Sequence, residues 1–267
     1  MSELLYAVPS TVIAFALFGL LAACIEIGHW LGRRRAQLST EASRGHVVDI
    51  QSAILGLSAL LLAFAFSLAL QRFDSRSEAV VDEANAIGTA FLRADLLPAP
   101  LRDEARVAIG AYLDARVDEA SLPLSEEDMR GAVNKVASGA QEALWNIAVR
   151  AARLEIDSRA PLLFVDAVNG LIDSYGRRTA SLSRHVPELV LSLLFLTFLL
   201  AGSIVGFAAG VASHRPSLVA YILVFLMVVL VFIVLDLDRP RRGIIRVSHV
   251  SLLELQSVVK IELKKAR

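Results

Sequence analysis

The run AILGLSALLLAFAFSLAL at residues 53–70 contains no charged side chain. A helix of these 18 residues rises about 27 Å, which is enough to cross most of the hydrocarbon core of a bilayer. Three other apolar runs of similar length occupy residues 4–25, 189–212 and 218–235. Backbone groups in lipid must form hydrogen bonds within their own segment, so uninterrupted apolar runs predict helices and not barrel strands. The sequence therefore predicts an all-α integral membrane protein with four transmembrane helices.

The overall composition excludes one class of partner and indicates another. Hydrophobic residues make up 55% of the 267 residues, which is above the range of ordinary soluble domains, so membrane lipid is an expected partner. Lys+Arg and Asp+Glu number 27 each. The chain therefore lacks the basic field that nucleic-acid-binding proteins use, and no nucleic acid partner is predicted.

The sequence shows no pattern of catalytic or metal-binding residues. The histidines lie far apart, at His29, His46, His185, His214 and His249. The single cysteine, Cys24, can build neither an intramolecular disulfide nor a zinc cluster. Phosphate-binding loops and dinucleotide fingerprints are also missing from the sequence. We therefore predict a protein that is not an enzyme, with no catalytic residue, cofactor or metal site.

The four apolar runs fall into two pairs. The third and fourth are separated only by residues 213–217, and so short a connection makes them antiparallel neighbours. We expect residues 1–70 to hold the first transmembrane pair and residues 188–235 the second. Residues 71–187 carry most of the acidic side chains and no apolar run of membrane length, which predicts a soluble insert.

The insert is predicted to be helical throughout. Apolar residues recur every three or four positions beyond residue 72, so the second membrane helix is expected to continue into water until Pro98. Further helices are predicted at residues 101–119, from Ser125 to about residue 157, and from Pro161 to Arg184, with Pro187 as a kink before the third span.

The C-terminal segment, residues 236–267, is predicted to form a charged turn and then an amphipathic helix at residues 251–265. The apolar face of this helix is expected either on the insert or in the lipid interface, because its composition suits both.

The positive-inside rule gives two conflicting orientations. The loop after the first run holds Arg33, Arg34 and Arg35, which favours that face as the cytoplasmic one. The opposite face carries more cations over more chain, among them Arg72 and Arg76, which favours the reverse.

Small residues within the runs predict where helices pack closely. Gly202, Gly206 and Gly210 form two successive GxxxG steps, which are typical of a helix packing face. In the second run Gly56, Leu60 and Phe64 share one helical stripe, which fits either a pore lining or ordinary packing.

One acidic residue lies at the end of the first run. Glu26 is one helical turn from His29. A proton-sensitive pair is one interpretation, but an acid at this depth is more often simply solvated, which is the interpretation we favour.

Two segments carry a family resemblance. They are EANAIGTAFLRADLLP at residues 83–98 and DLDRPRRGIIRV at residues 236–247. Together they resemble the bacterial bestrophin-like family, and the resemblance spans nearly the whole chain. It implies a multi-pass protein of the plasma (inner) membrane, with four spans and a helical insert after the second.

A more distant similarity connects this family to the bestrophins, which are pentameric anion channels with the same order of spans. The residues that resemble the bestrophin pattern are Phe64, Arg72, Phe73, Asp74 and Glu78. The likeness implies a homo-oligomer that conducts small ions, with Gly56, Leu60 and Phe64 at the pore neck and the insert in the cytoplasm. This sequence departs from the channels in lacking a Gly before Phe64 and a tandem Trp after Arg72.

The polar residues of the two family segments are expected to satisfy one another. They are Asn85, Thr89, Arg93 and Asp95 in the first segment, and Asp238 and Arg239 in the second. Ion pairs and hydrogen bonds between these groups would join the insert to the end of the last span.

The sequence leaves two functions open. One is a homo-oligomeric ion channel, a pentamer with anions as the expected ions and the second spans around the pore. The other is a non-conducting membrane scaffold or sensor that acts through its helical insert.

Overall fold

The computed structural model describes residues 8–36, 41–122, 127–154, 159–239 and 244–265. Of the residues that the structure describes, 88% are helical and none is in a strand. Four stretches are long and apolar enough to cross a membrane: Ser10–Arg35, Gly45–Ala94, Ala160–Val211 and Leu218–Asp238. The prediction of an all-helical protein with four membrane-length apolar helices is therefore confirmed.

The chain divides into two compact units. Unit 1 comprises residues 1–73 and 185–245, and unit 2 comprises residues 74–184 and 246–267. Helix α3, Glu41–Ala94, contributes to both units, because its apolar first part is followed without a break by the amphipathic part that was expected to continue it.

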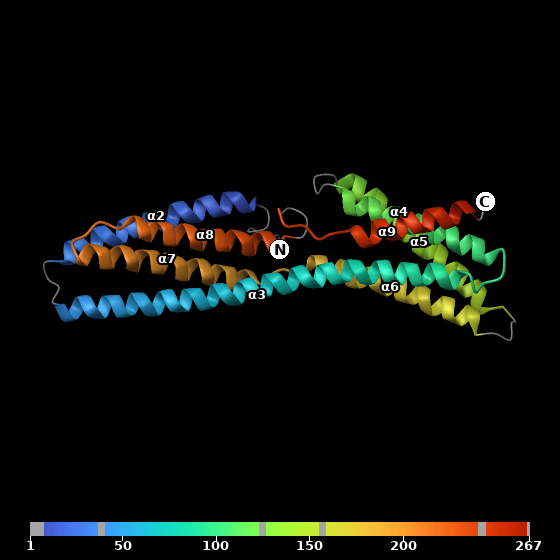
Figure 1. Cartoon of the computed structure of the whole chain (residues 1–267), viewed down its shortest axis with the longest axis horizontal. Coiled ribbons are helices and arrows are strands. Elements are labelled where there is room, and N and C mark those ends of the chain that lie inside the picture. Colours follow the sequence, from blue (N-terminus) through green and yellow to red (C-terminus); the bar gives the residue numbers. More distant parts are fainter. Residues whose placement is uncertain (1–7, 37–40, 123–126, 155–158, 240–243, 266–267) are drawn as a thin grey trace. The chain divides into compact units, whose positions relative to one another are not determined.

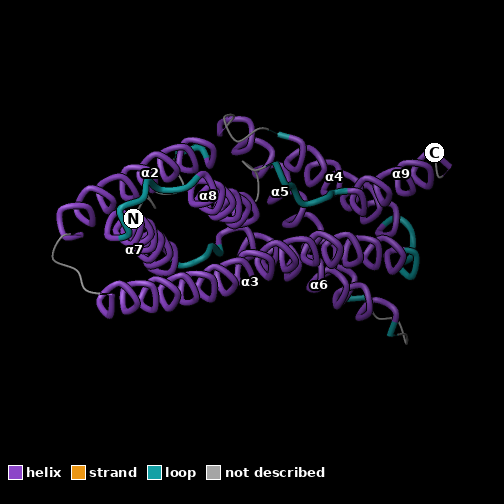
Figure 2. Tube along the Cα trace, turned by 60° about the vertical axis from the view of Figure 1, so that its left-hand side comes forward, coloured by secondary structure: helices purple, strands orange, loops and turns teal. Residues whose placement is uncertain are grey.

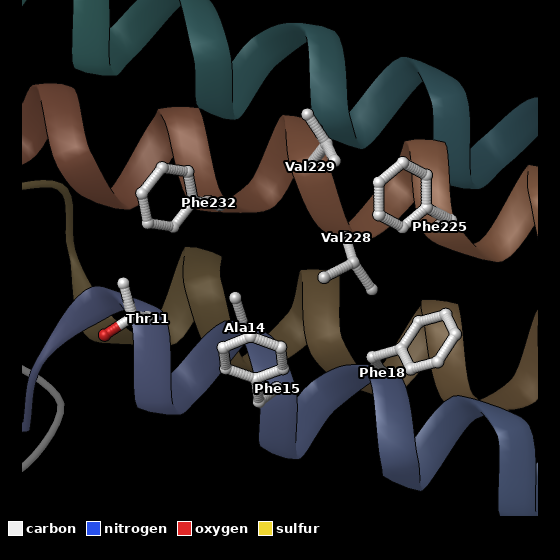
Figure 3. Close-up of a pocket in the computed structure, with 8 residues that line it drawn as sticks. All are labelled: Thr11, Ala14, Phe15, Phe18, Phe225, Val228, Val229 and Phe232. Atoms are coloured by element: carbon white, nitrogen blue, oxygen red, sulfur yellow. The ribbon is translucent and has the colours of Figure 1, made fainter.

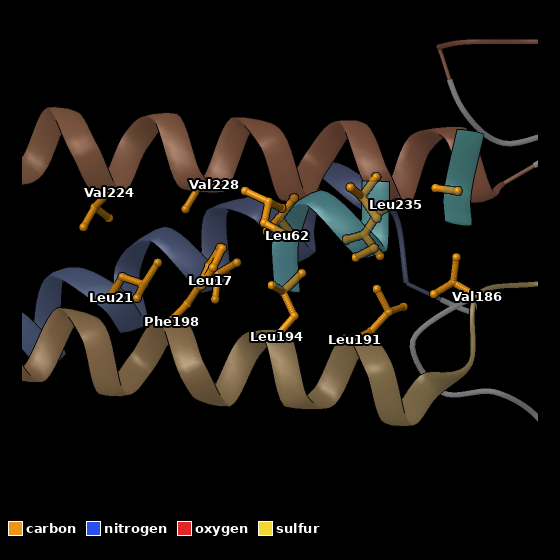
Figure 4. Close-up of a cluster of buried hydrophobic side chains, with 14 of the residues drawn as sticks. Leu17, Leu21, Leu62, Val186, Leu191, Leu194, Phe198, Val224, Val228 and Leu235 are labelled. Atoms are coloured by element: carbon orange, nitrogen blue, oxygen red, sulfur yellow. The ribbon is translucent and has the colours of Figure 1, made fainter. Parts of the chain in front are cut away.

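Unit 1 is built from α2 (Ser10–Arg35), the first part of α3, α7 (Glu188–Val211) and α8 (Leu218–Asp238). These helices lie side by side in both views (Figures 1 and 2). Their shared core contains Leu17 and Leu21 of α2, Leu62 of α3, Leu194 and Phe198 of α7, and Val228 and Leu235 of α8 (Figure 4). All four spans therefore contribute apolar side chains to one cluster.

Glycines bring α2 and α7 into direct backbone contact. A Cβ atom added to Gly28 would lie 2.1 Å from the Ser203 carbonyl oxygen of α7. In the other direction, a Cβ atom on Gly206 would lie 1.9 Å from the Ile25 oxygen, and one on Gly210 would lie 2.3 Å from the His29 oxygen. Such close approach is available only to glycine, and it is a common way for helices to pack in lipid.

Helices α2 and α8 also enclose a hollow of about 300 Å³ (Figure 3). The side chains that line it are Thr11, Ala14, Phe15, Phe18, Phe225, Val228, Val229 and Phe232. All of them except Thr11 are apolar, so the hollow suits a hydrocarbon chain better than a polar ligand.

Unit 2 is built from the second part of α3, α4 (Leu101–Ser121), α5 (Glu127–Ala152), α6 (Ala160–Ser183) and α9 (Val250–Lys265). Its buried apolar residues include Ile87, Ile109, Leu144, Phe164 and Leu252. Their burial removes the apolar faces of several helices from water.

The apolar face of α9 packs against the other helices of unit 2, so of the two places that the sequence allowed, the insert is the one observed. Helix α9 packs along α4 (Figure 1). Asp114 of α4 accepts a hydrogen bond from Gln256 at 2.6 Å and pairs with Lys260 at 3.2 Å. Leu252 and Val259 are buried beneath these contacts.

Several helix ends differ from the expected ones. Helix α2 begins at Ser10, directly after Pro9. It continues to Arg35, and α3 begins at Glu41, so both helices extend beyond their apolar runs. A helix that leaves the bilayer needs no apolar side chains to persist. Helix α5 ends at Ala152, before the expected residue 157. The expected beginnings at residues 4–7 and at Ser125, and the residues 155–158, lie outside the described residues.

The kink expected at Pro187 is a complete break between α6 and the third span. Helix α6 ends at Ser183, residues 184–187 are not helical, and α7 begins at Glu188. Proline disfavours helical geometry in the residue before it, so Pro187 turns Val186 out of the helix. The Val186 N–H donates to the Asp238 carboxylate, at 3.1 and 3.0 Å from its two oxygens.

Candidate functional site

The first candidate is an exposed face of α3 in unit 1. Leu60 and Phe64 keep 53% and 59% of their surface exposed, and nothing lies within 4 Å of a Cβ atom added to Gly56. By contrast, Leu62 and Ala65, on the opposite side of the helix, are buried in the core. The three residues expected at a pore neck therefore share one face that the single chain leaves uncovered.

Small residues share this face of α3 with Leu60 and Phe64. Ser52, Ala59, Ala63 and Ser67 are exposed along it together with Gly56. The exposed side of α8 is different, because it presents large apolar side chains: Leu218, Val219, Ile222, Phe225 and Leu226. Small residues let helix backbones approach one another, whereas large ones suit contact with lipid tails. The α3 face is thus suited to packing against another helix.

Beyond the apolar run, α3 exposes carboxylates at intervals of one turn. Asp74, Glu78 and Asp82 are exposed and lie four residues apart, which places them on one side of the helix. None of them forms an ion pair within the part of the chain that the structure describes. The nearby cation Arg76 is buried, and it donates to the carbonyl oxygens of Ser181 at 3.3 Å and Arg184 at 2.6 Å.

The second candidate is a buried ionic cluster in unit 2 centred on Glu83 of α3. Glu83 Oε1 accepts hydrogen bonds from Arg116 Nε at 2.6 Å and from the Tyr112 hydroxyl at 3.1 Å. Arg178 of α6 donates to Glu83 Oε2, and Arg116 also donates to Glu119. Two arginines thus balance two glutamates in a place without solvent, and they connect α3, α4 and α6.

The surroundings shift the pKa of two groups in this cluster, Tyr112 and Arg116. It raises the pKa of the Tyr112 hydroxyl, and the neighbouring Glu83 carboxylate raises it further. For Arg116, burial lowers the pKa, but Glu83 and Glu119 raise it by more, so the net shift is upward. Tyr112 therefore stays a hydrogen-bond donor and Arg116 stays a cation. The ion pairs and hydrogen bonds of the cluster hold the three helices together.

Sequence reasoning missed Glu83, although a signal was present. The residue lies three positions after buried Val80 and four before buried Ile87, so the helical period places it on the apolar face. A charged residue at such a position requires buried partners of opposite charge.

The polar residues of the first family segment have local roles in unit 2. Arg93 donates to Asp166 Oδ2 at 2.7 Å and to the Leu163 oxygen at 3.0 Å. Asp95 accepts from Arg106 at 2.6 Å. Asn85 and Thr89 are exposed on α3. The segment therefore ties α3 to α4 and α6.

The polar residues of the second family segment organise unit 1. Asp238 and Arg239 are buried. The Asp238 carboxylate accepts a hydrogen bond from the Val186 N–H, and its Oδ2 lies 3.5 Å from His185 Nδ1. Asp236 accepts the Ile245 N–H at 2.9 Å. These carboxylates fix the turn before α7 and the chain after α8. The expected contact between the two family segments stays a prediction.

The remaining predicted residues are the glycines of α7. Gly206 and Gly210 face α2, as described above, and a Cβ atom on Gly202 would lie 3.4 Å from Leu21. Across the described residues, no group of three or more His, Cys, Asp or Glu side chains is placed to hold a metal ion.

Four membrane-length helices and a helical second unit define an integral membrane protein. A family model for the bestrophin-like domain matches residues 19–252, so the chain belongs to the bestrophin-like family, as its sequence segments predicted. A crystal structure of a membrane protein is similar to it, with a TM-score of 0.61 at 15% identity, over 93% of this chain and 97% of that one. At this identity the likeness concerns the fold alone. No curated protein matches the sequence.

Proposed function

We propose that the protein is a homo-oligomeric ion channel of the plasma membrane, in which the α3 helices of the copies surround the pore. The observation that carries the proposal is the uncovered, small-residue face of α3 with Gly56, Leu60 and Phe64 on it. Membership of the bestrophin-like family supports it, because the bestrophins that the sequence resembles are pentameric channels. In the same arrangement, unit 2 lies in the cytoplasm.

The neck of this pore is apolar. Rings of Leu60 and Phe64, one residue from each copy, narrow it between the more open levels at Gly56 and Ser67. Apolar constrictions can stop ion flow by losing water, and they conduct when a small movement widens them. This gives the side chains of Leu60 and Phe64 the role of a gate.

The charges on α3 favour cations. Asp74, Glu78 and Asp82 follow the apolar part of the helix and are exposed, whereas Arg76 is buried against carbonyl oxygens. Repeated in each copy, these residues form rings of carboxylates at the entrance, and such rings attract cations and repel anions. The proposed ion therefore differs in sign from the anions expected from the bestrophin resemblance.

Ion flux into vesicles tests the proposal. Leu60→Ala and Phe64→Ala together should raise cation flux, because they widen the apolar neck. The matched control is Leu226→Ala, which shortens a side chain of the same type and exposure on α8. Flux that changes equally in the control and in the neck variant, or no flux in any form, would overturn the proposal.

A non-conducting scaffold is the alternative. It is favoured by the large apolar side chains that unit 2 leaves exposed, Leu92, Val107 and Met129 among them, since such residues commonly mark contact surfaces. A stable monomer in lipid, with a protein partner held through these residues, would support this alternative.

A further inference from the structure

A second pocket of unit 1, separate from the α3 face, has the chemistry of a headgroup site. Its volume is about 540 Å³. It is lined by Glu26, His29, Trp30 and Arg33 of α2, by Arg215 and Pro216 between α7 and α8, and by Tyr221 of α8. Unlike the hollow in Figure 3, it is lined mainly by polar and charged side chains.

The pocket lies at the level where two membrane spans end. In α2 the buried apolar residues end with Ile25, and Glu26 follows directly. Helix α8 begins at Leu218, so Tyr221 lies in its first turn. Tryptophan and tyrosine are enriched at this depth because their rings suit the boundary between hydrocarbon and headgroups. Residues of this kind at the ends of two candidate spans are typical of the headgroup region of a bilayer.

The pocket presents two cations, Arg33 and Arg215. Neither Arg33 nor Arg215 forms an ion pair in the part of the chain that the structure describes. The guanidinium of Arg34 stacks 3.6 Å above the Trp30 ring at the same end of α2, which adds positive charge beside the pocket. An anion that approaches this end of the molecule is attracted by these groups.

The pocket also contains one carboxylate, Glu26, with an oxygen that can still accept a hydrogen bond. The Tyr221 hydroxyl donates to Glu26 Oε1, which leaves Oε2 without a hydrogen bond among the described residues. A purely anionic ligand would be repelled by this carboxylate. A ligand with both a phosphate and an ammonium group satisfies the arginines and Glu26 together.

His29 adds a buried polar side chain to the lining of the pocket. Its exposed fraction is only 9%, it lines the pocket, and its Nδ1 is buried without a hydrogen-bond partner in the described structure. Buried polar atoms in native proteins are nearly always paired, so this imidazole is a further polar group that the pocket region has to satisfy. The contact of Gly210 with the His29 backbone holds the residue in place.

We propose that this pocket binds the headgroup of a membrane phospholipid that carries a phosphate and a primary ammonium, as phosphoethanolamine does. Arg33 and Arg215 hold the phosphate, with His29 beside them, and Glu26 accepts the ammonium. The acyl chains enter the bilayer along the apolar surfaces of α2 and α8. This proposal does not depend on conduction, so a result against the channel would leave the lipid site untouched, and the reverse also holds.

Native mass spectrometry of the full-length protein tests the site. Delipidated protein in detergent is titrated with phosphatidylethanolamine, with phosphatidylglycerol and with inorganic phosphate. The double variant Arg33→Gln with Arg215→Gln should bind phosphatidylethanolamine at least about tenfold more weakly, because charged hydrogen bonds are lost. Glu26→Gln should abolish the preference for the ethanolamine headgroup and keep phospholipid binding. The matched control, Arg35→Gln, removes an exposed cation of the same helix end outside the pocket lining and should bind as the unmodified chain does.

Three results would overturn the proposal. Equal binding by the double variant and the Arg35→Gln control would show that the arginines of the pocket are not the site. Occupation by inorganic phosphate as tight as by phospholipid would show a free-anion site. A preference for phosphatidylglycerol that Glu26→Gln leaves unchanged would remove the role of Glu26.

Discussion

Replacing Glu83 by glutamine removes one negative charge from the buried cluster of unit 2 and changes almost nothing in shape. Glu83 faces two buried cations, Arg116 and Arg178, and together with Glu119 it brings the charge of the cluster to zero. In the Glu83→Gln variant the cluster holds one uncompensated positive charge that cannot reach water. Removing one partner from a buried ion pair costs about 3–5 kcal/mol, because the remaining charge is left without solvent or counter-charge.

The matched control is Glu104→Gln. Glu104 also pairs with an arginine of another helix of unit 2, Arg150, but both side chains are about half exposed. An exposed pair of this kind contributes about 0–1 kcal/mol, since water screens both charges. At roughly 2–4 °C per kcal/mol, Glu83→Gln should lower the Tm by about 6–20 °C, and the control by about 4 °C at most.

The assay is thermal unfolding in detergent, followed by the helical circular dichroism signal at one heating rate for all three forms. An equal fall in Tm for the two variants would refute this prediction, because burial would then make no difference to the contribution of an ion pair to the free energy of unfolding.

Three further predictions follow from other contacts. Because burial raises the pKa of Tyr112 above its ordinary value of 10.0, the unfolded chain loses this proton first as the pH rises, so the free energy of unfolding should fall by about 1.4 kcal/mol per unit above pH 10. Tyr112→Phe removes that contribution, and unfolding of both forms between pH 8 and 11 checks it; parallel curves would contradict it. Gly206→Ala forces a Cβ against the Ile25 oxygen and should cost about 1–3 kcal/mol in unfolding measurements, whereas Gly19→Ala, with open space around it, should cost nothing. Arg93→Ala breaks a partly exposed pair with Asp166 and should cost about 1 kcal/mol or less, so a Tm loss as large as that of Glu83→Gln would show a buried role for Arg93.

The membrane helices could be predicted because the length of an apolar run, compared with the thickness of a bilayer, is enough to identify them. A run such as residues 53–70 is apolar over the thickness of a bilayer, and lipid accepts it only as a helix. The same reasoning could not place the last turns of α2 or the first turns of α3, since they lie beyond the apolar runs. Pro187 marks the break before α7 in the sequence, but the carboxylate that accepts the Val186 N–H there belongs to Asp238, 52 residues away, and could not be foreseen.

The site was predictable only where a single helix defines it. Gly56, Leu60 and Phe64 share a face through helical periodicity alone, so their common exposure could be anticipated. Glu26 and His29 were visible as neighbours, but Arg215 and Tyr221 reach the same pocket from the connection before α8 and from its first turn. Burial of Glu83 likewise depends on arginines from two other helices.

The mass of the full-length protein in native lipid discs tests the central claim most directly, because a pore lined by α3 requires several copies around one axis. The account predicts the mass of five chains, with the α3 faces of the copies turned toward the centre. The mass of one or two chains would contradict it, because two α3 helices cannot enclose a pore.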